Sequence, residues 1–164
     1  MTIREALVRA RKLLAASNIE DVSLESELLL RHALNISRVQ LYLDFDSELT
    51  PEQEAVFGQL LERRLRHEPT AYITGHCEFF GLDFYVDPRV LIPRSGTELL
   101  VEAALKVARR HLTRNERTYL IADVGVGSGI VAITLARYLP QAKIYASDIS
   151  VAALEVAACL LYTS

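Results

Sequence analysis

The sequence has no tryptophan, and its 164 residues include only two cysteines, one methionine and seven glycines. Cys77 and Cys159 lie far apart and have no histidine or cysteine at ligand spacing, so we expect neither a disulfide framework nor a metal site. No apolar run approaches the ~18 residues that a membrane-spanning helix needs. Charge of neither sign dominates, because 18 basic and 21 acidic residues give a net charge of −3. These absences favour a cytoplasmic location and give no indication of a membrane or of direct nucleic-acid binding.

The composition, 51% hydrophobic and 24% charged, is typical of a folded chain with one domain or two small ones. Apolar residues recur at helical spacing over 3–14 and 24–34, and a shorter helix is expected over 38–43. Thr50, Pro51 and Gln53 predict the start of a fourth helix, because threonine caps, proline suits the first turn and glutamine reaches back to the cap. We therefore expect a helical bundle over residues 1–67.

The last helix of this bundle is expected to end near Arg66, within a basic cluster. The cluster consists of Arg63, Arg64, Arg66 and His67. It could contact RNA or an acidic partner, or it could be a solvated helix end favoured by the helix dipole.

Residues 68–92 differ in composition from the helical part. The segments 71–75, 78–81 and 82–86 are short, rich in aromatic or β-branched residues, and punctuated by glycine, which predicts a β-hairpin linker. Ser95 and Glu98 then have the spacing of a capping box that would open a helix over about 96–111. A polar connection over 113–117 follows.

The final part reads as strand, glycine loop, helix, strand, helix. The strands are expected at 119–124 and 143–147, the first helix at 130–139, and the second from Ser150, as its cap, to about 158. This β-α-β-α order predicts a parallel sheet, so 93–164 is assigned to an α/β domain. Two strands with their helices cannot bury both faces of such a sheet, and exposed apolar surface is expected.

Ligands of open parallel sheets bind beyond the carboxyl ends of the strands. Gly125, Gly127 and Gly129 follow the first strand and would let a ligand approach the backbone closely. Asp148 ends the next strand, 19 positions after Gly129, near the ~20-residue offset at which a carboxylate accepts hydrogen bonds from a ribose. An adenosine-bearing ligand is the resulting hypothesis.

The spacing of the loop narrows the choice of ligand. Dinucleotide sites need G-x-G-x-x-G, and this sequence has Ile130 where that pattern has its third glycine. Asp123, at the strand end, would repel a pyrophosphate but suits the positively charged methionine part of S-adenosylmethionine. A purely structural alternative is that the glycines only turn the chain and that Asp148 only caps the last helix.

With these motifs the sequence resembles the protein-(glutamine-N5) methyltransferases of the HemK/PrmC type, which modify class I peptide chain release factors. The likeness covers about residues 3–158. Its most specific parts are 68–75, the hairpin residues 78–82, the segment 90–94 with Thr97 and Glu98, and the loop 123–129 with Asp148.

The resemblance implies a helical substrate-recognition domain (1–67), a hairpin linker (68–92) and the first part of a Rossmann-like class I methyltransferase domain (93–164). It implies an enzyme that uses S-adenosylmethionine to methylate the glutamine side-chain amide in the Gly-Gly-Gln motif of a class I release factor, its protein partner. The cofactor-binding residues carried over by position are Asp123, Gly125, Val126, Gly127, Ser128, Gly129 and Asp148 in the loop region, with Arg94, Thr97 and Glu98.

The sequence also departs from the family. The Asn-Pro-Pro-Tyr motif that positions the substrate amide is absent, so no catalytic residue is assigned. Val126 stands where threonine is usual, and Ser95-Gly96 where proline and an acidic residue are usual. After Ala158 the sequence no longer follows the family, and we expect a truncated, catalytically incomplete domain.

Two alternatives remain from the sequence. One is a partner-binding helical domain with a vestigial α/β part. The other is an adenine-N6 nucleic-acid methyltransferase, because enzymes of that type also use the Asn-Pro-Pro-Tyr motif that is absent here. The helical domain and the hairpin argue against this second alternative.

Overall fold

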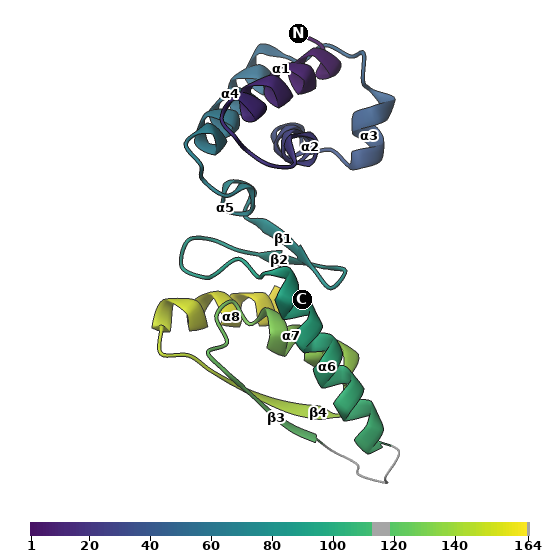
Figure 1. Ribbon diagram of the computed structural model, residues 1–164, viewed down its shortest axis with the longest axis vertical. Coiled ribbons are helices and arrows are strands. Elements are labelled where there is room, and N and C mark those ends of the chain that lie inside the picture. The colour runs from purple at the N-terminus through teal and green to yellow at the C-terminus, as the bar shows by residue number, and fades with distance from the viewer. Residues whose placement is uncertain (113–118, 164) are drawn as a thin grey trace. The chain divides into compact units, whose positions relative to one another are not determined.

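The computed structural model describes residues 1–112 and 119–163, which form two compact units, Met1–Thr74 and Gly75–Ser164. The first unit contains five helices, and the second contains a β-hairpin, three helices and a two-stranded sheet (Figure 1). The polar connection expected at 113–117 lies outside the described residues. No described helix is long and apolar enough to cross a membrane.

The first unit is built from helices α1 (Ile3–Ala16), α2 (Val22–Leu34), α3 (Arg38–Leu43), α4 (Pro51–Leu65) and α5 (Thr70–Thr74). The first four confirm the helices expected from the spacing of apolar residues. Helix α2 ends at Leu34, and its C-cap residue, Asn35, adopts the left-handed conformation typical of helix ends. Fully buried leucines on α1, α2 and α3 form the centre of this unit: Leu7, Leu14, Leu29, Leu30 and Leu41.

The start of α4 has the geometry that the sequence predicts. The Thr50 hydroxyl accepts a hydrogen bond from the Gln53 N–H at 3.2 Å, and the Gln53 side chain accepts one from the Thr50 N–H at 2.9 Å. Pro51 occupies the first turn, where no backbone donor is needed. Two of the N–H groups that the helix start would leave unpaired are thus satisfied.

Replacing Thr50 by alanine should lower the free energy of unfolding of the first unit by about 1 kcal/mol, because the hydroxyl acceptor at the helix start is lost. Urea unfolding followed by circular dichroism measures this change. Thr50→Ser is the matched control and should stay close to the parent chain, because it keeps the hydroxyl. If both variants unfolded alike, the cap would contribute nothing to stability.

The expected β-structure over 71–75 is wrong for its first four residues, because Thr70–Thr74 forms helix α5. The Ile73 N–H donates to the Pro69 carbonyl at 3.1 Å, and the Ile73 side chain is buried in the core of the first unit. The Thr70 hydroxyl donates to the Glu25 carboxylate of α2. Tertiary packing against the bundle therefore overrides the β-branched, aromatic composition of this segment.

The basic cluster of residues 63–67 is largely committed to ion pairs within the first unit. Arg63 binds Glu68 through two hydrogen bonds of 2.8 and 2.5 Å. Arg64 donates to Glu25 at 2.8 Å, with both side chains mostly buried. These contacts support a structural role for the two arginines.

The second unit begins with an antiparallel hairpin, β1 (His76–Phe79) and β2 (Leu82–Tyr85), in which Phe79 pairs with Leu82. Phe80 and Gly81 form the two-residue turn, both with positive φ. This backbone is that of the tight hairpin turns that match strand twist. The hairpin predicted within 68–92 is confirmed for the segments 78–81 and 82–86.

Helix α6 (Ser95–Leu112) precedes the parallel pair β3 (Tyr119–Val124) and β4 (Ala142–Ser147), with α7 (Ile130–Tyr138) between the strands and α8 (Val151–Thr163) after them. The parallel pairing of β3 and β4 confirms the predicted α/β architecture. Helix α6 begins at Ser95, one residue earlier than the capping pattern predicted.

The two faces of the β3–β4 sheet differ. Ile121 and Ile144 are paired in register and partly buried on one face, which α7 and α8 cover. Leu120 and Val124 point to the other face and are 73% and 82% exposed. The predicted exposure of apolar sheet surface is therefore confirmed.

Candidate functional site

The glycine loop connects β3 to α7 and lies at the carboxyl ends of the two parallel strands. The N–H groups of Gly125 and Val126 donate to the Ser147 carbonyl at 2.8 and 3.0 Å. The loop after β3 is thus fastened to the last residue of β4. The positions of Gly125, Gly127 and Gly129, all with positive φ of 54° to 84°, require the backbone freedom of glycine.

Asp148 joins the loop to the start of α8. Its Oδ2 accepts a hydrogen bond from the Gly127 N–H at 2.8 Å, and its Oδ1 accepts one from the Ser150 N–H at 2.9 Å. Ser150 itself caps α8, because its hydroxyl accepts from the Ala153 N–H. The structure brings together Asp148 and the glycines, as the sequence predicts, and assigns the helix cap to Ser150.

The hydrogen bonds from Ser150 and Gly127 lower the pKa of Asp148 below its ordinary value of 3.8. A carboxyl whose pKa is lower in the folded state stabilises that state above its unfolded pKa. This contribution is complete at neutral pH and is lost as the pH falls below 3.8 through the folded value. Asp148 therefore presents a full negative charge to any ligand at neutral pH.

Asp123 is the second carboxylate of the site and is the penultimate residue of β3, just before the loop. Its Oδ2 is buried and has no hydrogen-bond partner within the part of the chain that the structure describes. Burial raises the pKa of Asp123, a hydrogen bond from the Ala132 backbone lowers it, and the charge of Asp148 raises it. An unpaired buried acceptor is costly, and it suits a ligand that brings a positively charged donor.

The side chains of the two remaining loop residues, Val126 and Ser128, are buried, at 6% and 3% exposure. Val126 lines an apolar cavity of about 350 Å³ between α7, β4 and α8, which has no charged lining residue. The polar groups that surround the glycines are therefore the two aspartates and the exposed backbone of Gly125.

Arg94, Thr97 and Glu98 lie at the start of α6. Within the described residues, none of them is hydrogen-bonded to the glycine loop. The Thr97 N–H donates to the Arg94 carbonyl at 2.8 Å, which shapes the helix start. The Glu98 carboxylate accepts a hydrogen bond from the Phe80 N–H at 2.8 Å and so holds the hairpin turn. The sequence does not predict this contact of Glu98, because Phe80 and Glu98 are 18 residues apart and form no local pattern.

Glu98→Ala should leave the partly buried Phe80 N–H without its acceptor and destabilise the second unit by about 1–2 kcal/mol. Hydrogen exchange of the Phe80 amide and thermal unfolding measure this. Glu98→Gln is the control, because its amide oxygen can still accept, and it should retain most of the protection. Equal exchange in both variants would contradict the assigned contact.

Comparisons with known proteins match both parts of the chain. The family model of the PrmC N-terminal domain matches residues 5–75, and that of the methyltransferase small domain matches residues 94–162. A release factor glutamine methyltransferase of Moorella thermoacetica is 48% identical over 157 residues, which are 96% of this chain and 54% of the relative. A second, of Koribacter versatilis, is 44% identical with the same coverage.

A bifunctional methyltransferase of Rickettsia felis is 36% identical over an alignment that covers 95% of this chain and 34% of the relative. The chain spans about half the length of the release factor glutamine methyltransferases that it matches. The matched ranges extend over both units, and the range 94–162 contains the positions of the glycine loop and of Asp148. The chain therefore belongs to the release factor glutamine methyltransferase family.

Proposed function

We propose that this chain holds S-adenosylmethionine for the methylation of the glutamine side-chain amide in the Gly-Gly-Gln motif of a class I release factor. The observation that carries the proposal is the pair of carboxylates around the glycine loop. Asp148 is ionised and lies against the loop backbone, and Asp123 has a buried oxygen without a partner. The names of the relatives support the same activity.

The residues fit the cofactor by charge and by shape. Asp148 would accept hydrogen bonds from the ribose hydroxyls, since a carboxylate oxygen can accept more than the one N–H bond it already has. Asp123 would balance the positive charge of the methionine part. Gly125 and Gly127 have open space where a Cβ would stand, so a ligand can approach their backbone. The bound cofactor would supply an electrophilic methyl group.

The positioning of the substrate amide is a separate requirement. An amide nitrogen is a poor nucleophile, and it must be held in line with the methyl group by hydrogen bonds. The Asn-Pro-Pro-Tyr motif that the family uses for this purpose is not among these 164 residues. We therefore propose that these residues hold the cofactor and contact the release factor, and that they do not position the amide.

We also propose a cytoplasmic location for this function. Neither Cys77 nor Cys159 forms a disulfide, and Cys159 is exposed. Disulfides are rare in reducing compartments such as the cytoplasm.

Titration calorimetry of the 164-residue chain with S-adenosylmethionine tests the cofactor assignment. We expect saturable one-to-one binding by a sample that circular dichroism shows to be folded. Absence of heat from a folded sample would overturn the assignment. A full-length relative of the same family serves as the positive control.

Methyl transfer needs its own measurement. Incubation with tritiated S-adenosylmethionine and a Gly-Gly-Gln-bearing release factor should label the factor with the full-length relative and leave it unlabelled with this chain. Labelling by this chain alone, purified free of any longer protein, would overturn the proposal that it does not position the amide.

A further inference from the structure

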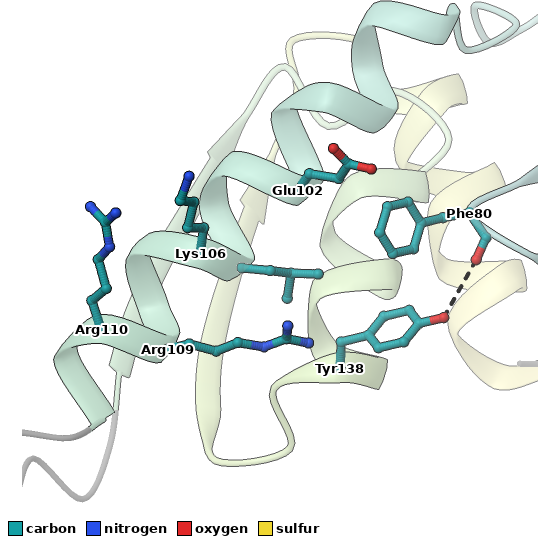
Figure 2. Close-up of a pocket in the computed structure, with 7 residues that line it drawn as sticks. Phe80, Glu102, Lys106, Arg109, Arg110 and Tyr138 are labelled. Carbon is teal, nitrogen blue, oxygen red and sulfur yellow. Dashed lines mark hydrogen bonds between the residues drawn. The ribbon is translucent and has the colours of Figure 1, made fainter.

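A second cavity of the Gly75–Ser164 unit is lined by charged and aromatic side chains and shares no lining residue with the glycine loop. Its volume is about 640 Å³. Helix α6, helix α7 and the hairpin turn contribute the lining residues, which are Phe80, Glu102, Leu105, Lys106, Arg109, Arg110 and Tyr138 (Figure 2). Nothing in the proposed methyl transfer uses these residues.

Helix α6 supplies one charged stripe to this cavity. Glu102, Lys106 and Arg109 recur at steps of four and three residues, which places them on one side of the helix. Lys106 and Arg109 are exposed, and neither has an ion pair within residues 1–112 and 119–163. The stripe carries opposite charges at its two ends, because Glu102 lies about 10 Å before Arg109 along the helix axis at 1.5 Å per residue.

The aromatic end of the cavity is fixed in place. The rings of Phe80 and Tyr138 meet edge to face, with centroids 5.3 Å apart and planes at 80°. The Phe80 N–H donates to Glu98, and its carbonyl accepts from the Tyr138 hydroxyl at 3.5 Å. The φ of 54° at Phe80 is that of the two-residue hairpin turn, which fixes the position of the ring at the edge of the cavity.

Figure 2 shows how the two ends are arranged. The Glu102 carboxylate lies beside the Phe80 ring, and the guanidinium of Arg109 points toward Tyr138. Lys106 lies between Glu102 and Arg110 along α6. A ligand in this cavity would therefore meet the Phe80 ring and the Glu102 carboxylate on one side, and the Arg109 guanidinium beside Tyr138 on the other, with Lys106 further along α6.

We propose that this cavity binds a nucleotide, with the base against Phe80 and Tyr138 and the phosphate at Lys106 and Arg109. Aromatic side chains bind bases through their faces, and lysine and arginine bind phosphate. Glu102 can accept a hydrogen bond from a base N–H, as carboxylates do in base recognition.

The polarity of the cavity favours a nucleotide over other anions. An acidic peptide would bring its carboxylates close to Glu102, and inorganic phosphate would leave the aromatic end unused. The net charge of the chain, −3, gives no indication of such a site, because the site depends on a local stripe of cations. The basic cluster at 63–67 is therefore not the only one, and the helical spacing of Lys106, Arg109 and Arg110 is the sequence signal for the second.

The nucleotide could be free or part of a single-stranded RNA, and two probes separate these sources. Calorimetry with guanosine monophosphate measures the free nucleotide. Fluorescence anisotropy with a labelled single-stranded RNA decamer of mixed sequence measures the strand. Binding of both with similar affinity indicates a mononucleotide site, and much tighter binding of the decamer indicates an RNA strand.

The charge variants test where the ligand binds. Lys106→Gln/Arg109→Gln should weaken binding of the tighter probe about tenfold at 0.1 M salt, and should reduce the salt dependence of RNA binding by about one to two phosphate contacts. The matched control is Arg9→Gln/Lys12→Gln, which removes two exposed cations from α1 and should change the affinity less than twofold. Equal losses of affinity in both double variants would mean that binding depends only on net charge. That result would overturn the assignment of the site to this cavity.

The aromatic end has its own variant. Phe80→Gly removes the ring at a backbone position that glycine tolerates, so the hairpin should remain folded while binding falls about tenfold. Unchanged affinity of this variant would overturn the placement of the base. Failure of both the nucleotide and the RNA to bind, or equal binding of a poly-glutamate decamer that the double variant also weakens, would overturn the proposal. None of these outcomes depends on S-adenosylmethionine.

Discussion

Gly129→Ala should destabilise the second unit by about 2–4 kcal/mol, which corresponds to a fall of about 10–20 °C in its melting temperature. Gly129 has a φ of 84°, and a Cβ there would stand 3.1 Å from the Cβ of Ala157 and 3.3 Å from Ile133 Cδ1. The isoleucine end can rotate away, whereas Ala157 belongs to α8 and moves only if the helix moves. Backbone strain and crowding therefore add at this position.

The other glycines separate these two causes. Gly125→Ala and Gly127→Ala also place alanine at positive φ, but in open space, so each should cost only about 1 kcal/mol of strain. Gly58→Ala, at an exposed position within α4 with nothing within 4 Å, should raise stability by about 0.5–1 kcal/mol. Thermal unfolding measures the series, with hydrogen exchange to assign each change to one unit. A Gly129→Ala variant as stable as Gly125→Ala would show that α8 does not pack closely on the loop.

The sequence predicts most of the helices and the parallel strand pair because their signals are local. Thr50, Pro51 and Gln53 stand within four residues, and the structure shows the hydrogen bonds that this pattern indicates. The nearly continuous apolar run of β3 marks it as a strand but does not distinguish its two faces, since Leu120 and Val124 are exposed and Ile121 is partly buried. The hairpin turn at Phe80-Gly81 is found in the predicted segment because glycine punctuates it.

The failures arise where distant residues decide the structure. The helical conformation of Thr70–Thr74 depends on Glu25 and on the core around Ile73, neither of which is visible in a short window. The contact of Glu98 with Phe80 joins a helix start to a hairpin turn. Such long-range packing overrides local propensity.

For the candidate site, the sequence predicts that Asp148 lies beside the glycine loop, but it does not predict the buried, unpaired oxygen of Asp123. The glycine loop and Asp148 meet as the β-α-β order predicts. The burial of Asp123 Oδ2 without a partner depends on how α7 covers the end of β3, which sequence spacing does not reveal. That unpaired oxygen favours a cationic ligand group, which could donate a hydrogen bond to it. It therefore supports S-adenosylmethionine over a pyrophosphate cofactor.

Asp148→Ala should weaken S-adenosylmethionine binding about 100-fold, because hydrogen bonds to a charged group contribute about 1.5–3 kcal/mol each and each 1.4 kcal/mol is a factor of ten. The variant also frees the N–H groups of Gly127 and Ser150, so the loop itself should loosen. Asp83→Ala, which removes an exposed carboxylate from the hairpin, is the control and should leave the affinity unchanged. Calorimetry measures all three proteins.

The loss of a ribose contact and the loosening of the loop can be separated by changing the ligand. S-adenosylhomocysteine and its analogue without the two ribose hydroxyls differ only in the groups that Asp148 would bind. The analogue should bind the parent chain more than tenfold more weakly than S-adenosylhomocysteine, and Asp148→Ala should bind both about equally, because the coupling between the carboxylate and the hydroxyls is then lost. If the variant still preferred the ligand with the hydroxyls by the same factor, Asp148 would act only by holding the Gly127 N–H. The structural interpretation of that carboxylate would then be correct, and another residue would have to recognise the ribose.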